Sequence, residues 1–444
     1  MKTTASLPAS FLAPAATLAF LLLAAAAAPP ARAEEWIAVK GARIIPVSSP
    51  PIENGTVLVR DGRIEAVGGP ELEVPWQART LDGTGKVVVP GYVLAHTSRG
   101  LDSANEQVDT VPFVSVLDAL DPVNAFFEDS LRDGVTTICV MPGNATLIGG
   151  QGMIVKPHGL TVEQMIVKRD AGLKISMDPP RSGSRMSHVQ KLRRTFIELK
   201  DELERIAEKR AEAAEAAKAE TSGVGPPPAP PKEEPEVDLK KRPLVDLLEG
   251  RLAAFVYCDR AADVDRAFEV AETFKFKIVP VLGPRCHKAA RLLAEKKLPV
   301  ILDPTLVYYE RDEDTRKEKK RFVPDLLRQG GVATMAFTSD PSEFGSRYLW
   351  YQAALAVRNG MDEAEALRSV TLYPAQAIGL GDRVGSLEKG KDGNFVILSG
   401  DPLDYRTWVE TVVIEGKIAY RREDDARLKK VLGAAAAAAP GESK

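Results

Sequence analysis

The chain has 444 residues, of which 44% are hydrophobic and 27% charged, with 59 Lys and Arg against 62 Asp and Glu. This composition is typical of a globular protein and excludes collagenous, coiled-coil and fully disordered classes. The formal net charge of −3 leaves no excess of basic side chains to neutralise a phosphate backbone, so we expect no nucleic-acid partner. Three cysteines are too few for a disulfide framework or a zinc cluster. There are only four histidines.

Residues 1–33 have the order of a secretory signal peptide. Lys2 precedes an apolar run over residues 11–28, and Ala31, Arg32 and Ala33 form a small-x-small cleavage site. A membrane anchor is the alternative, but the run is short and mostly alanine, which gains little from burial in lipid. We therefore expect cleavage after Ala33, a periplasmic or secreted location, and no membrane span after cleavage.

Short β-rich segments with turn signals occur at both ends of the chain. Residues 37–41, 56–60 and 63–67 are predicted strands, and Asp61-Gly62 is a hairpin signal between two of them. Similar segments recur only at residues 394–398 and 411–414. We expect residues 34–89 and 383–421 to form one small β-sandwich, followed by a flexible tail over residues 422–444.

The middle of the chain, residues 90–382, alternates apolar runs with stretches of helical composition. The runs are rich in β-branched residues, as parallel strands buried on both faces require. They fall at residues 135–140, 252–257, 277–281, 299–302 and 332–337, with a further run at 87–89 before the first Pro-Gly pair. Repeated βα units of this kind favour an α/β fold with a (β/α)8 TIM-type barrel over a doubly wound sheet.

An insertion over residues 188–243 interrupts this pattern. Its apolar residues repeat at spacings of three and four, which predicts an amphipathic helix. These residues are Leu192, Phe196, Leu199, Leu203 and Ile206. A Pro-rich linker follows over residues 223–235. The helix either packs on the barrel or docks a protein partner, and the pattern does not choose between the two.

Two ordered sets of motifs resemble the amidohydrolase superfamily, in its imidazolonepropionase-like and dipeptidase-like branch. Residues 90–98 read Pro-Gly-Tyr-Val-Leu-Ala-His-Thr-Ser, and residues 385–397 read Gly-Ser-Leu-Glu-Lys-Gly-Lys-Asp-Gly-Asn-Phe-Val-Ile. The resemblance implies a hydrolase acting on carbon–nitrogen bonds, in an amide, cyclic amide or peptide. It also implies a barrel flanked by a β-sandwich, in agreement with the layout above.

Hydrolases of this superfamily use one or two divalent metals to lower the pKa of a bound water. The resemblance places His96 and Asp340 at two ligand positions. Ser98 stands where the second histidine of the family's His-x-His pair belongs, and a serine hydroxyl is a poor zinc ligand. Leucines occupy two further family positions, at Leu94 and Leu282.

After the predicted strand at 252–257, Tyr257 and Asp259 replace a His-Ala-His run of the relatives. One interpretation is an altered site holding a single zinc, manganese or iron ion through His96, Asp340 and Asp259, with Asp340 also the general base. Tyr257, Arg260 and Ser98 would then contact the substrate. The other interpretation is that His96 and Asp340 make only hydrogen bonds at the barrel mouth.

Two functions are therefore predicted. The first is an exported metal-dependent hydrolase of carbon–nitrogen bonds in a small molecule. The second is a non-catalytic pseudoenzyme that retains the fold and the pocket as a binding or scaffold protein.

Overall fold

The computed structural model describes residues 34–180, 183–220, 236–340 and 346–438. The predicted signal peptide and the Pro-rich linker lie outside these residues. The chain divides into two compact units, Met1–Glu35 and Trp36–Lys444, and the elements below belong to the second. Within the described part, no helix combines the length and the apolar character needed to cross a membrane.

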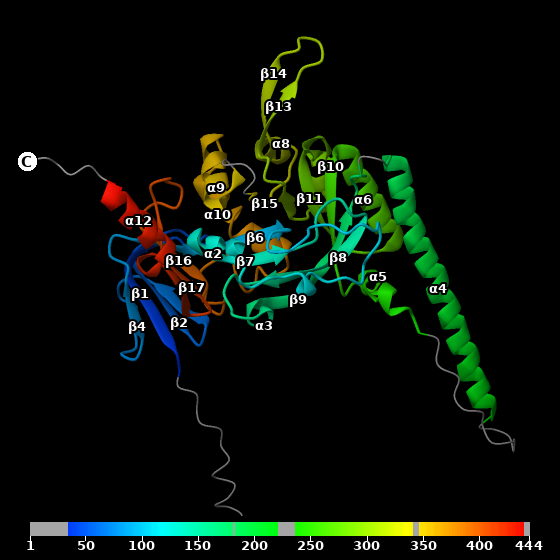
Figure 1. The fold of residues 1–444 in the computed structure, drawn as a ribbon, viewed down its shortest axis with the longest axis horizontal. Coiled ribbons are helices and arrows are strands. Elements are labelled where there is room, and N and C mark those ends of the chain that lie inside the picture. Colours follow the sequence, from blue (N-terminus) through cyan, green and yellow to red (C-terminus); the bar gives the residue numbers. More distant parts are fainter. Residues whose placement is uncertain (1–33, 181–182, 221–235, 341–345, 439–444) are drawn as a thin grey trace, which may run out of the picture. The chain divides into compact units, whose positions relative to one another are not determined.

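Strands from both ends of the chain form one sheet (Figure 1). Its order is β18-β17-β16-β5-β1-β2-β3, and β4 pairs with β1. The strands are β1 (Trp36–Ile44), β2 (Ile52–Arg60), β3 (Arg63–Gly68), β4 (Arg79–Asp82), β5 (Val87–Pro90), β16 (Phe395–Leu398), β17 (Val409–Ile414) and β18 (Lys417–Arg421). The run at 87–89 is therefore part of this sheet, where β5 pairs with β16 and β1, and not part of the barrel.

The middle of the chain forms an eight-stranded sheet that is nearly closed into a barrel, which confirms the predicted fold class. The order is β15-β12-β11-β10-β9-β8-β7-β6. The strands are β6 (Tyr92–Thr97), β7 (Val135–Val140), β8 (Ile148–Val155), β9 (Ile166–Ser176), β10 (Ala254–Arg260), β11 (Ile278–Arg285), β12 (Val300–Leu302) and β15 (Met335–Phe337). The end strands β6 and β15 lie against each other.

One strand departs from the predicted all-parallel pattern. Strand β8 runs antiparallel to both β7 and β9, while the other pairs in this sheet are parallel. The connections explain this difference, because residues 141–147 contain no helix and α3 (Val162–Met165) is a single turn. A parallel crossover needs a dozen or more residues.

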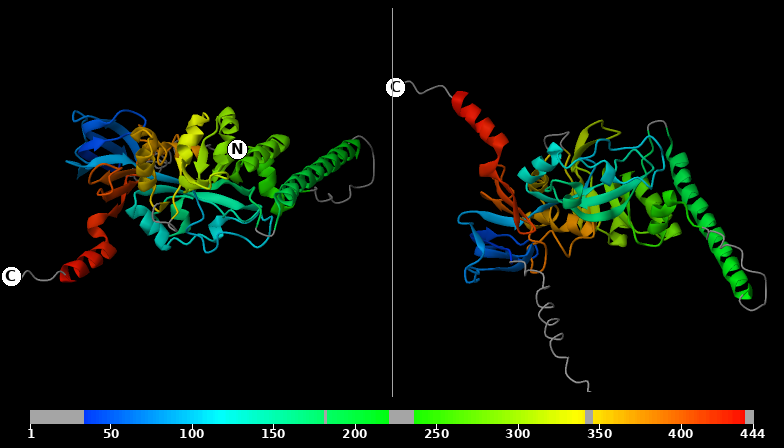
Figure 2. Two further views of the ribbon diagram at one scale, coloured as in Figure 1. Left: turned by 90° about the horizontal axis from the view of Figure 1, so that it is seen from above. Right: turned by 60° about the horizontal axis from the view of Figure 1, so that its bottom comes forward.

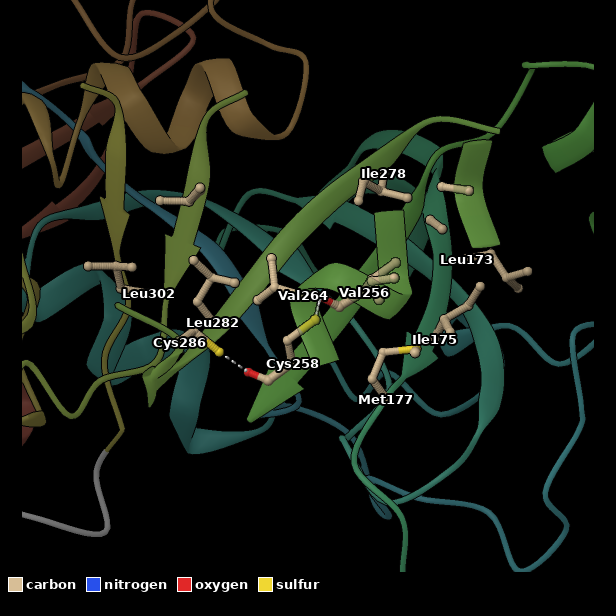
Figure 3. Close-up of a cluster of buried hydrophobic side chains, with 14 of the residues drawn as sticks. Leu173, Ile175, Met177, Val256, Cys258, Val264, Ile278, Leu282, Cys286 and Leu302 are labelled. Carbon is tan, nitrogen blue, oxygen red and sulfur yellow. Dashed lines mark hydrogen bonds between the residues drawn. The ribbon is translucent and has the colours of Figure 1, made fainter. Parts of the chain in front are cut away.

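The barrel strands alternate between two apolar layers, as a period of two requires. Ala254, Val256 and Cys258 of β10 pack outward against helices, whereas Phe255 and Tyr257 face the barrel interior. Figure 3 shows the outer layer, with side chains of β9, β10, β11 and β12 around Val264 of α6 (Ala261–Phe274). The α-helices that follow α6 in the chain, up to β16, are α7 (Ala290–Lys296), α8 (Val323–Gln329), α9 (Leu349–Arg358), α10 (Glu363–Arg368) and α11 (Leu372–Ala377).

The insertion contains the long helix α4 (Arg185–Glu220) and the short helix α5 (Arg242–Leu248). Leu192, Phe196 and Leu199 are buried in the barrel's outer layer, so the first half of α4 packs on the barrel. The second half extends past the barrel (Figures 1 and 2). A protein partner for this half stays a prediction.

Two further segments complete the described chain. A hairpin of β13 (Val307–Arg311) and β14 (Glu318–Phe322) projects from the barrel (Figure 1). Within the segment 422–444, predicted to be a flexible tail, the described residues include helix α12 (Ala426–Ala438). Its start is fixed because Asp425 accepts a hydrogen bond from the Leu428 amide and pairs with Arg132 of α2 (Ala125–Arg132).

Candidate functional site

A cavity of about 370 Å³ lies where the barrel strands end. The C-terminal ends of β6, β10, β12 and β15 contribute side chains to it, and this is the face of a barrel where binding sites are built. Its polar lining residues are His96, Thr97, Ser98, Arg99, Asn144, Tyr257, Asp303, Thr305, Thr338, Ser339, Asp340 and Ser346.

A bulge in β6 aims His96 into the barrel. Tyr92 and Leu94 face the outer layer, so simple alternation would turn His96 outward as well. The pairing of β6 with β7 shifts register between Leu94 and Thr97, which inserts one residue at this point. Such bulges re-aim side chains next to functional sites.

The Nε2 atom of His96 lies 2.7 Å from Nζ of Lys174. Lys174 is on β9, between Leu173 and Ile175 of the outer layer, so it points into the barrel, and it is fully buried. Its amine also lies 5.6 Å from the centroid of the Tyr257 ring. The structure thus brings together a histidine, a lysine and a tyrosine from three separate strands.

Burial controls the charge of this group. It lowers the pKa of Lys174 to about 7, because an ammonium loses its hydration inside the barrel. Burial and the neighbouring Lys174 together hold the pKa of His96 well below its usual range. Burial also raises the pKa of Tyr257. His96 is therefore a neutral ring at physiological pH, and it accepts a hydrogen bond at Nε2 whenever Lys174 is protonated.

Two aspartates, Asp303 and Asp340, line the same cavity as His96. Asp303 follows β12 and accepts a hydrogen bond from the Thr305 amide, and burial raises its pKa, with the charge of Asp340 adding to the effect. Asp340 follows β15, where its amide donates to the carbonyl of Ser346. Together they give this side of the cavity a negative character.

An unsatisfied acceptor also belongs to the cavity wall. Asn144 lines it, and its side-chain oxygen Oδ1 is buried with no hydrogen-bond partner among the described residues. A buried acceptor without a partner is costly, so Oδ1 of Asn144 is open to a hydrogen bond from a water or from a ligand in the cavity.

Asp259 does not face this cavity. Its carboxylate pairs with the guanidinium groups of Arg185 at 3.6 Å and Arg260 at 3.5 Å, and with that of Arg285. Arg185 comes from the start of α4 and also pairs with Asp178 and Asp263. Asp259 is therefore enclosed by cations, and Arg260 contacts it instead of lining the cavity.

These donors do not fit a metal. The Nε2 atom of His96 is occupied by an amine, and Asp259 is enclosed by arginines. Across the part of the chain that is described, no group of three or more His, Cys, Asp or Glu side chains could hold a metal ion. Of the residues predicted from the sequence, His96, Asp340, Tyr257 and Ser98 meet at one cavity, whereas Asp259 and Arg260 lie outside it.

Two residues of this site, Asp303 and Asn144, are missed by the sequence because they stand in no recognisable motif. Lys174 has no motif to support a metal-bridging role like that of a carboxylated lysine in relatives, and its contact with His96 is seen only in the structure. Lys174 lies in a strand whose alternation, Leu-Lys-Ile between apolar neighbours, would have placed one charged side chain inside the barrel.

Comparisons with known proteins agree with the resemblance to amidohydrolases seen in the sequence. The model of the amidohydrolase family matches residues 269–419. A crystal structure of an amidohydrolase from Thermotoga maritima is 32% identical, with a TM-score of 0.72, and the match covers 87% of this chain and all of that one. Amidohydrolase tasK of Hapsidospora irregularis is 24% identical over 82% of this chain, which spans 39% of that protein's length. Imidazolonepropionase of Clostridium tetani is 30% identical over 30% of this chain and 32% of its own length.

Proposed function

The chain belongs to the amidohydrolase family, and on this premise we propose that its barrel-mouth cavity binds a small polar amide without a metal-activated water. The observation that carries the proposal is the 2.7 Å contact between Lys174 Nζ and His96 Nε2. The amine of Lys174 lies at Nε2 of His96, the atom through which this histidine would otherwise bind a metal. The family's fold and pocket are kept, and its usual chemistry is replaced by binding.

The cavity wall is suited to an amide. Asn144 Oδ1 is an acceptor in need of an N–H group, and the hydroxyls of Ser98 and Ser339 are donors for a carbonyl oxygen. The volume of about 370 Å³ is in the range of small-molecule sites. The ligand class is a small amide, cyclic amide or dipeptide.

Calorimetric titration with hydantoin and with the dipeptide glycyl-proline tests the binding. We expect heat of binding for at least one probe with the wild type, and affinity reduced roughly tenfold in Asn144→Ala, because a ligand N–H loses its acceptor. Asn359→Ala, outside the cavity, is the matched control and keeps wild-type affinity. The proposal is overturned if neither probe binds the wild type at millimolar concentration. It is also overturned if Asn144→Ala binds the probes as tightly as Asn359→Ala does.

A second candidate is hydrolysis of a carbon–nitrogen bond, favoured by the two cavity aspartates and by the hydrolase names of the relatives. Asp340 would take a proton from a water that attacks the amide carbon, and the products would be an amine and a carboxylate. If the probes are hydrolysed, Asp340→Asn should abolish turnover. Unchanged turnover in that variant rules out this role of Asp340.

We also propose that the protein is exported, on the basis of residues 1–33 alone. N-terminal sequencing of protein recovered from the periplasm or medium of the producing cell should give a chain that starts at Glu34. A chain that retains residues 1–33 in the cytoplasm would overturn export without affecting the ligand site.

A further inference from the structure

A second and larger cavity, of about 630 Å³, lies near the N-terminal end of β6, whereas the first cavity lies at the C-terminal end of that strand. Tyr92, the first residue of β6, lines it, whereas His96 near the end of β6 lines the barrel mouth. Its walls come from the end of α2, the start of α9, the loop between β16 and β17, and the start of α12. The two cavities share no lining residue.

Aromatic rings dominate this second cavity. Two of the protein's four tryptophans, Trp350 and Trp408, line it. Tyr348 stacks on Trp350 with ring centroids 5.7 Å apart, and Tyr351 meets the same indole edge-on. Tyr405 and Trp408 are 76% and 54% exposed, so these two large rings lie at the rim, where Arg406 is 5.9 Å from the centroid of Tyr405.

Most charges around the cavity are already paired. Arg132 contacts Asp425 at 2.8 Å, and Tyr420 donates to the same carboxylate at 3.1 Å. The guanidinium of Arg422 lies 4.2 Å from the centroid of Trp408 and covers one face of this indole in a cation–π contact. Asp404 is hydrogen-bonded by Arg406.

Asp133 is the exception. It lines the cavity directly after α2 and is half-buried, and its carboxylate makes no hydrogen bond or ion pair within the described part of the chain. The charged groups that act on it are Asp129, Arg132 and Arg347. A half-buried carboxylate beside several aromatic faces is complementary to one ligand chemistry, a cation attached to an apolar body.

We propose that this cavity binds an organic ammonium ion that carries an aromatic or aliphatic group. The ammonium lies against Asp133, and the apolar group packs among Tyr348, Trp350 and Trp408. The volume admits a ligand of ordinary metabolite size. The site is independent of the barrel mouth and needs no activity there.

Titration of the intact protein with benzyltrimethylammonium tests this site, followed by calorimetry and by tryptophan fluorescence. We expect saturable binding at least roughly tenfold tighter than that of benzyl alcohol, which has a similar ring and no charge. Benzoate, of opposite charge, should not bind. Failure to saturate at millimolar concentration, or equal affinity for the alcohol, overturns the proposal.

Four variants localise the binding. Asp133→Asn should weaken benzyltrimethylammonium roughly tenfold and leave benzyl alcohol unchanged, whereas Asp404→Asn, a paired aspartate of the same cavity, should change neither. Trp408→Ala at the exposed rim should weaken both probes, and it serves if Asp133→Asn does not fold. His96→Ala should leave the affinity for the cation at the wild-type value. Loss of binding in His96→Ala overturns the assignment to this cavity. Wild-type affinity in both Asp133→Asn and Trp408→Ala overturns it as well.

Discussion

The amine of Lys174 and the ring of His96 form one hydrogen-bonded unit inside the barrel, with Nζ and Nε2 2.7 Å apart. The two residues are 78 positions apart in the sequence, on β9 and β6. This contact takes up the nitrogen through which a histidine at this position would otherwise bind a metal.

Burial of Lys174 has a consequence for stability that depends on pH. Its pKa is about 7 in the folded protein and near 10.5 in the unfolded chain. Between these values the unfolded chain holds a proton that the folded protein lacks, so the unfolding free energy rises with pH across this window. Below pH 7 both states are protonated, and the destabilisation is constant.

Replacing the amine should remove this dependence. We expect Lys174→Met to be more stable than the wild type at pH 7, with the difference narrowing by about 1.4 kcal/mol per pH unit toward pH 10. Urea unfolding at pH 7, 8 and 9 measures it. Lys209→Met, on the exposed part of α4, is the control and should track the wild type. Parallel stability curves for wild type and Lys174→Met would show that the amine is not neutralised by folding.

Helix α4 contributes to the stability of the barrel through Phe196. This ring is fully buried, and its centroid lies 5.1 Å from those of Phe274 and Phe276. Phe196→Ala should lower the unfolding free energy by about 3–5 kcal/mol in urea denaturation. Glu208→Ala, exposed on the same helix, should change it by less than about 0.5 kcal/mol. Equal effects of the two substitutions would mean that α4 does not pack on the barrel.

Binding of an organic ammonium in the second cavity should depend on pH through Asp133. Burial, together with Asp129, raises the pKa of Asp133 to about 7, against the opposing effect of Arg347 and Arg132. The carboxyl group is neutral below this value and negative above it, so the affinity for benzyltrimethylammonium should increase from pH 6 to pH 8. In Asp133→Asn the affinity should be flat across this range. A pH profile that survives this substitution would assign the titration to another group.

Much of the barrel mouth could be predicted from the sequence, because functional side chains of this fold follow the ends of strands. His96, Ser98, Tyr257 and Asp340 each stand at such an end, and they do line one cavity. The antiparallel β8 could not be predicted, since Gly149, Gly150, Gln151 and Gly152 lack the β-branched and aromatic side chains that mark a strand.

The surroundings of Asp259 could not be predicted for a different reason. Arg185, one of its three partners, is 74 positions away at the start of an inserted helix, and no local pattern announces that contact. Likewise, the bulge that turns His96 inward depends on the register between β6 and β7, which is a property of two paired strands.

We propose that the amidohydrolase barrel of this protein binds its ligand without a resident metal, and the metal content of the purified protein tests this proposal. Protein purified without chelators and then dialysed against zinc, manganese or iron should retain well under one metal per chain by mass spectrometry, with the same value in His96→Ala and Asp340→Asn. One tightly held metal per chain in the wild type, lost in both variants, would contradict the account.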